Sequence, residues 1–118
     1  MHFKASSPIA LTLMMLAQPV IAGHLPRGDA ANGEELYNGT CVACHGEDGK
    51  GAFDGIPDLT GKEGRLAKPD DILFNHIRDG FQSDGSFMAM PARGGNPDLS
   101  DQDLVDLLAY LKARFAEK

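Results

Sequence analysis

The sequence predicts a small all-α domain, made of three main helices joined by long loops. Two stretches combine helical periodicity with start and stop signals, and a third helical stretch leads into a short cysteine motif. No stretch predicts a strand of more than a few residues. Only 20 of the 96 residues that follow residue 22 are Leu, Ile, Val or Phe. So thin a set of apolar side chains predicts that a large apolar group fills part of the interior.

Residues 1–22 have the composition of a secretory signal peptide. Lys4 precedes an almost wholly apolar stretch at 9–22, and small residues before Gly23 predict cleavage after Ala22. The alternative is a membrane anchor, but this stretch contains Pro19 and is shorter than the ~20 residues that span a bilayer. We therefore expect a periplasmic domain of residues 23–118, with no membrane insertion after cleavage.

The first helix is expected from about Asp29 to Thr40, continuing into the cysteine motif. Asp29 is a candidate N-cap. Gly33 and Tyr37 lie one turn apart and share a face, and the glycine would let another helix approach closely.

Both cysteines of the chain occur in one short motif, Cys41-Val42-Ala43-Cys44-His45. Thiols at i and i+3 lie on one side of a helical turn, and the C-x-x-C-H spacing is that of covalent haem attachment. We interpret Cys41 and Cys44 as the thioether sites and His45 as the proximal ligand of the haem iron.

Three other chemistries compete for this motif. The two thiols could form a disulfide, or act as the redox dithiol of a thioredoxin-like fold, although that fold requires strands. Zinc could be held by Cys41, Cys44, His45 and the distant His76, although zinc sites usually space their second ligand pair by several residues. We favour haem attachment over all three.

The second helix is expected over residues 68–80. Pro69 suits the first helical position, the two aspartates after it suit the positive end of the helix dipole, and Gly80 suits a left-handed C-terminal cap. His76 lies on this helix and is a candidate distal ligand, but we favour a partly exposed surface histidine.

The sixth iron ligand is expected from the loop that follows. Met88 and Met90 are the only methionines after residue 22, and a thioether is a soft ligand that raises the reduction potential. Met90 is favoured because Pro91 restricts it to extended geometry and stiffens the loop. Met88 remains the alternative ligand. Another possibility is that neither methionine binds the iron and that both side chains only fill gaps in the packing.

The third helix is expected over residues 101–115. Ser100 can cap it, with Asp103 reaching back in a capping box. The apolar side chains at spacings of three and four form a face that must be buried: Leu104, Leu107, Leu108 and Leu111.

Taken together, the motifs resemble those of the class I c-type cytochromes over nearly all of residues 23–118. The likeness lies in five segments: 33–37 (GEELY), 41–45 (CVACH), 56–59 (IPDL), 90–91 (MP) and 106–112 (DLLAYLK). The resemblance implies a small cytochrome c fold around one covalently bound haem c. It also implies that Leu107 and Tyr110 cross the first helix at Gly33 and Tyr37.

The resemblance extends to the haem surroundings. It implies that the carbonyl of Pro57 accepts the ring N–H of His45, that Leu59 packs on the proximal haem face, and that Met90 binds the iron opposite His45. A carbonyl acceptor of this kind fixes the orientation of a metal-bound histidine and raises its basicity.

The function we expect is soluble electron transfer, with the iron cycling between Fe(II) and Fe(III) and no enzymatic bond chemistry. One rival is a haem enzyme or a gas or peroxide sensor with an open sixth site, and another is the cytochrome subunit of a dehydrogenase. Cleavage after Ala22 removes Lys4 and no acidic residue, so the net charge changes from −6 to −7. We expect redox partners with a basic docking patch, and no nucleic acid.

Overall fold

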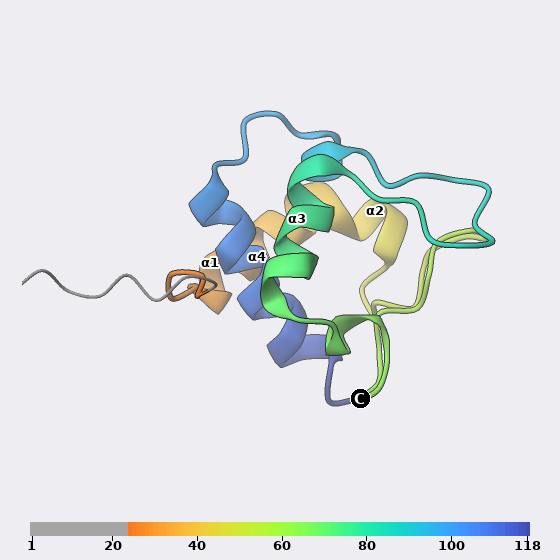
Figure 1. Ribbon diagram of the computed structural model, residues 1–118, viewed down its shortest axis with the longest axis horizontal. Coiled ribbons are helices and arrows are strands. Elements are labelled where there is room, and N and C mark those ends of the chain that lie inside the picture. Colours follow the sequence, from red (N-terminus) through yellow and green to blue (C-terminus); the bar gives the residue numbers. More distant parts are fainter. Residues whose placement is uncertain (1–23) are drawn as a thin grey trace, which may run out of the picture.

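The computed structural model describes residues 24–118, so the predicted signal peptide and its cleavage site lie outside the described residues. The described chain is all-α, as predicted, with three main helical segments and long loops (Figure 1). Within it, the only β pairing is an isolated antiparallel bridge between Phe81 and Met90. None of the described helices is both long enough and apolar enough to cross a membrane.

The first helical segment is continuous from the N-cap to the cysteine motif, as predicted. It consists of α1 (Ala30–Leu36), a π-helical turn η1 (Tyr37–Cys41) and α2 (Val42–His45). The carboxylate of Asp29 caps it by accepting hydrogen bonds from the first turn. The π turn was not predicted. This wide turn is closed by the Val42 N–H, which donates to the Tyr37 carbonyl.

The second helix, α3 (Asp70–Asp79), follows a 3₁₀ turn η2 (Arg65–Ala67), and it corrects two details of the prediction. Pro69 is not the first helical residue: its backbone is extended, and its carbonyl accepts the first helical bond from Leu73 N–H at 3.1 Å. Gly80 has φ 85° and ψ 159°, a positive-φ conformation that favours glycine but is not the left-handed helical one. The reason is that the chain turns at once into the bridge with Met90.

The third helix, α4 (Asp101–Phe115), has the predicted bounds and follows a 3₁₀ turn η3 (Ala92–Gly95). Its capping box is confirmed. The Ser100 hydroxyl accepts from Asp103 N–H at 3.1 Å, and the Asp103 carboxylate accepts from Ser100 N–H at 2.9 Å.

The core forms where α1 crosses α4, which confirms the predicted contact. A Cβ on Gly33 would overlap the backbone carbonyl of Asp106 and lie 2.8 Å from the Tyr110 Cβ. The rings of Tyr37 and Tyr110 pack with centroids 5.4 Å apart. The buried apolar side chains come mainly from α4: Tyr37, Leu59, Leu66, Leu73, Phe74, Leu99, Leu104, Val105, Leu107, Leu108, Tyr110, Leu111 and Phe115.

Two loops meet on the side of the molecule opposite α1. The loop that follows α2 and the loop between α3 and η3 approach each other there, at the right of Figure 1. The Ser86 hydroxyl donates to the Gly55 carbonyl at 3.1 Å and joins them. Together with α2, α3 and α4, these loops surround a central cavity.

Candidate haem-binding site

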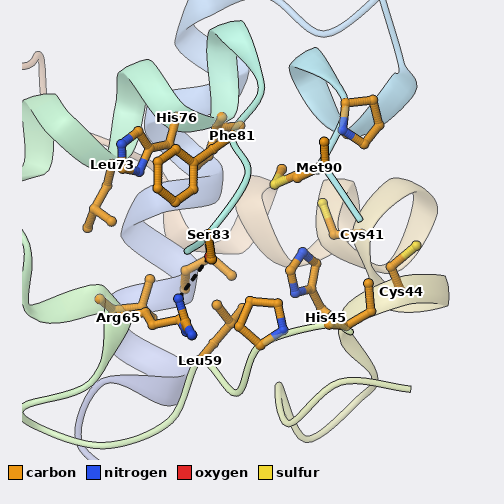
Figure 2. Close-up of a pocket in the computed structure, with 18 of the residues that line it drawn as sticks. Cys41, Cys44, His45, Leu59, Arg65, Leu73, His76, Phe81, Ser83 and Met90 are labelled. Atoms are coloured by element: carbon orange, nitrogen blue, oxygen red, sulfur yellow. Dashed lines mark hydrogen bonds between the residues drawn. The ribbon is translucent and has the colours of Figure 1, made fainter. Parts of the chain in front are cut away.

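The cavity collects every residue that the sequence analysis assigned to the site. Cys41, Cys44, His45, Pro57, Leu59 and Met90 all line it, and so do the two alternative ligands Met88 and His76. Most of the remaining lining is apolar, including Tyr37, Ile56, Leu66, Leu73, Ile77, Phe81, Leu107 and Leu111. Figure 2 shows the side chains of His45 and Met90 directed towards this space from different parts of the chain.

The cysteines sit on the cavity wall with free thiols. Cys41 is half-buried and Cys44 is exposed. Burial, with a smaller effect from Cys44, raises the pKa of the Cys41 thiol to about 11. The reactive cysteine of a thioredoxin-like dithiol has a lowered pKa, so this environment does not fit the redox dithiol alternative.

His45 has the properties of an iron ligand. Burial lowers its pKa, so the imidazole is neutral near pH 7 and a ring nitrogen can donate a lone pair. Its Nδ1 is buried and is the only such side-chain atom of the described residues without a hydrogen-bond partner. The hydrogen bond to the Pro57 carbonyl, implied by the resemblance, is therefore not formed in this structure. Pro57 contributes to the cavity wall instead, so this bond stays a proposal for the haem-bound protein.

The backbone around His45 is fixed by the glycine-rich loop that follows it. Gly51 N–H donates to the His45 carbonyl at 2.9 Å and Ala52 N–H to the Cys44 carbonyl at 2.8 Å, so the chain folds back on the motif. The buried Tyr37 hydroxyl donates to the Gly46 carbonyl at 2.5 Å. Burial raises the pKa of Tyr37, which keeps this donor protonated.

Leu59 is placed by the same loop. Its N–H donates to the Gly49 carbonyl at 2.8 Å, and its side chain is buried. Gly49 has φ 73°, and a Cβ there would lie 2.7 Å from the Phe115 ring, so α4 packs directly against the loop backbone. The C-terminal helix thus supports the His45 side of the cavity.

On the other side, Met90 is held by its backbone. Its N–H donates to the Phe81 carbonyl at 2.8 Å and its carbonyl accepts from Phe81 N–H at 3.1 Å. Met90 is half-buried, whereas Met88 is 39% exposed. After Pro91, Arg93 secures the loop to α4, donating to the Leu99 carbonyl at 2.7 Å and pairing with Asp101 at 2.7 Å.

His76 is already engaged by an aromatic neighbour. Its ring stacks on Phe81 with centroids 3.7 Å apart and an interplanar angle of 12°. Burial, and then the nearby Lys68 charge, lower the pKa of His76. The imidazole is therefore part of a packed cluster at the cavity wall, which does not favour it as a distal ligand.

Several lining residues were missed by the sequence analysis, notably Arg65 and Phe81. The Arg65 guanidinium donates to the Ser83 hydroxyl at 2.9 Å beside the cavity (Figure 2). With Lys68, it brings positive charge to a mainly apolar lining, which suits a planar apolar group that carries carboxylates. Arg65 and Phe81 belong to none of the sequence motifs, so their place at the site is visible only in the fold.

The residues present fit haem better than zinc. Two cysteines, a neutral histidine with an unpaired nitrogen and a thioether line one apolar cavity. In residues 24–118, no three His, Cys, Asp or Glu side chains converge as a metal site would need.

The sequence has clear relatives. Residues 28–111 match the family model described as cytochrome c oxidase, cbb3-type, subunit III. The chain is 40% identical over 88 residues to cytochrome c-554(548) of Halomonas halodenitrificans, covering 74% of this chain and 98% of that protein. The chain belongs to the monohaem class I c-type cytochromes. It is also 34% identical over 89 residues to cytochrome c-555 of Prosthecochloris aestuarii, covering 70% of this cytochrome and 85% of that one.

Solved structures agree with this assignment. Cytochrome c6 from the diatom Phaeodactylum tricornutum matches this cytochrome with a TM-score of 0.52 and 31% identity, over 73% of this chain and 93% of that one. Membership of the family implies a covalently bound haem c. The motif that holds Cys41 and Cys44 predicts that these two residues are its attachment points.

Proposed function

We propose that this cytochrome is an exported electron carrier, in which His45 and Met90 ligate the iron of one haem attached to Cys41 and Cys44. The observation that carries the proposal is the cavity itself, which has His45 and the half-buried Met90 on its wall and an otherwise mainly apolar lining. When bound, the haem supplies a metal that cycles between Fe(II) and Fe(III).

The protein residues contribute rigidity and exclusion of water. The backbone bonds of the loop after His45 and of the Phe81–Met90 bridge hold both ligands in fixed geometry. Leu59 and the leucines of α4 present a dry wall, which lowers the local dielectric and limits access of small molecules. Such a site favours electron transfer without a change of ligands, rather than bond chemistry on a substrate.

The location and the partners belong to this proposal. The signal-peptide pattern supports export to the periplasm after cleavage at Ala22. A net charge of −7 for residues 23–118 supports redox partners that present a basic docking patch. The proposed mature protein is a single domain of residues 23–118, formed by cleavage of the signal peptide after Ala22.

The test of the ligand set uses matched methionine variants. Holo-cytochrome purified from cells that mature c-type haem should carry one covalent haem by mass and no free thiols. Met90→Leu should abolish the weak long-wavelength absorption band of methionine-bound ferric haem and let the ferrous protein bind carbon monoxide rapidly. Met88→Leu, a change in the same loop, should leave both properties as in the wild type.

Two results would contradict the proposal. Rapid carbon monoxide binding by the wild-type protein would favour the open-site sensor or enzyme. Loss of the band in Met88→Leu but not in Met90→Leu would transfer the ligand role to Met88.

A further inference from the structure

The sixth-ligand loop is closed at its base by a single pair of residues. Phe81 and Met90 exchange both backbone hydrogen bonds, at 3.1 and 2.8 Å, and form an isolated antiparallel bridge. Between them, most of residues 82–89 are exposed. Without the bridge, the chain at Met90 would be held only from its C-terminal side, where Arg93 secures it, and the thioether would be positioned less firmly.

The side chain of Phe81 is anchored on α3, outside the loop. Its ring stacks on the His76 imidazole with centroids 3.7 Å apart, nearly parallel at 12°. The Lys68 ammonium lies 4.9 Å from the centroid of the same ring. These contacts join the start of the loop to the last turn of α3 and to Lys68, which precedes that helix, while α3 itself packs against α4.

Gly80 permits this arrangement by letting the chain turn sharply. It has φ 85°, and a Cβ there would lie 2.9 Å from the Met90 carbonyl oxygen and 3.0 Å from Ala92 N. The end of α3 therefore packs directly against the backbone on either side of Pro91. Only Gly80 separates α3 from Phe81, and its close packing limits its movement.

We propose that Phe81 is a positioning residue for the sixth ligand: its stack on His76 and Lys68 holds the backbone bridge that sets the Met90 thioether at the iron. This inference rests on the proposed function, because it takes Met90 as the ligand. Phe81 acts through Met90 and does not itself bind the metal. Loosening the stack should weaken the methionine–iron bond without changing the attachment of the haem.

The test measures how readily Met90 leaves the iron in holo-cytochrome. As pH rises, the ferric protein loses the methionine absorption band when another ligand replaces the thioether, and the midpoint of this change reports the strength of the bond. Phe81→Ala should lower the midpoint by about one pH unit and speed carbon monoxide binding to the ferrous protein about tenfold, given the usual strength of aromatic stacking and cation–π contacts. Phe81→Tyr, which keeps the stack, should restore wild-type values.

Two further variants make the result specific. Phe87→Ala removes a phenylalanine that is 74% exposed in the same loop, and it should leave the midpoint unchanged. His76→Ala removes the stacking partner without touching the loop, and it should shift the midpoint in the same direction as Phe81→Ala. If Phe81→Ala does not acquire haem, His76→Ala still tests the inference. A wild-type midpoint in either Phe81→Ala or His76→Ala would overturn the inference.

The failure of this inference can be separated from failure of the proposed function. If Met90→Leu loses the methionine band while Phe81→Ala keeps the wild-type midpoint, the ligand assignment stands and the positioning role is wrong. If Met90→Leu keeps the band, the ligand assignment itself is wrong, and the positioning role falls with it.

Discussion

Asp106 is a buried carboxylate with a structural role, and it does not line the cavity. Its side chain accepts hydrogen bonds from Asp29 N–H at 2.8 Å, Asn32 Nδ2 at 2.8 Å and Gln102 Nε2 at 3.0 Å. Burial alone would raise the pKa of Asp106, but these three bonds outweigh it and hold the pKa below its ordinary value of 3.8. The carboxylate therefore ties the start of α1 to α4 in its charged form.

Asp106→Asn should destabilise the holoprotein by about 1–3 kcal/mol at pH 7, because a charged acceptor of several bonds is replaced by a neutral amide. The pKa of Asp106 is lower in the folded state, so its contribution is present above the unfolded value near 3.8 and is lost as pH falls through the lower folded pKa. Denaturant unfolding should thus show a difference between wild type and variant that shrinks below pH 3.8. Asp98→Asn, at an exposed carboxylate, serves as the control. An equal difference at every pH would contradict the role of the charge.

The contrast between His45 and Asp106 shows which residues the sequence can reveal. Cys41, Cys44 and His45 form a local motif whose spacing alone indicates haem, and Met90 stands out because methionine is rare after residue 22. Asp106 lies in the segment 106–112, but nothing local predicts its hydrogen bonds, since its backbone partner Asp29 lies 77 positions away. Phe81 is likewise recognisable only once the fold brings Met90 beside it.

At the scale of whole elements, the crossing of α1 and α4 organises the fold. Gly33 allows the helix backbones to touch, and the Tyr37 ring packs against both Tyr110 and Phe115, with centroids 5.4 and 5.5 Å away. The same tyrosine donates to the Gly46 carbonyl. Helix packing is thereby coupled to the position of the haem motif.

Gly33→Ala should lower the stability of the holoprotein by about 1–3 kcal/mol, because the added methyl group overlaps backbone that cannot move aside easily. Gly39→Ala is a matched control in the same helical segment, since a Cβ there meets nothing within 4 Å. It should be neutral or stabilising by up to about 1 kcal/mol. Chemical denaturation of the two variants, followed by the haem absorption, checks this. Equal effects would show that the close approach is not what requires glycine.

The elements were predictable to the extent that their signals were local. The bounds and capping box of α4 and the N-cap of α1 follow from side chains within one turn. The π turn at Tyr37–Cys41 and the positive-φ backbone of Gly80 do not follow from such local signals, because each is set by the direction that the next segment takes. Tertiary packing overrides helix-end rules at these two places.

At the scale of the whole molecule, the chain is short of apolar side chains and has an excess of acidic ones. The shortage of apolar side chains agrees with a cavity at the centre of the fold, which is lined by residues of α2, α3, α4 and both loops. The excess of acidic side chains gives the surface a negative field, and two haem carboxylates would add to it. The proposed function thus predicts how the cytochrome meets charged reagents.

The reduced cytochrome should react faster with a small cationic oxidant than with an anionic oxidant of similar potential. At low salt the negative field concentrates the cation and repels the anion, and the rates should differ by at least about tenfold beyond their intrinsic reactivity. The screening length falls from roughly 30 Å at 0.01 M to roughly 10 Å at 0.1 M ionic strength, so this difference should shrink steadily as salt is added. Stopped-flow measurement of haem oxidation with both reagents checks this, and a neutral oxidant serves as control. Rates that do not depend on salt for either charged reagent would remove the reason to expect a basic partner. An anion that reacted faster at low salt would place a local positive patch at the site of electron exit, and the partner would then be acidic there.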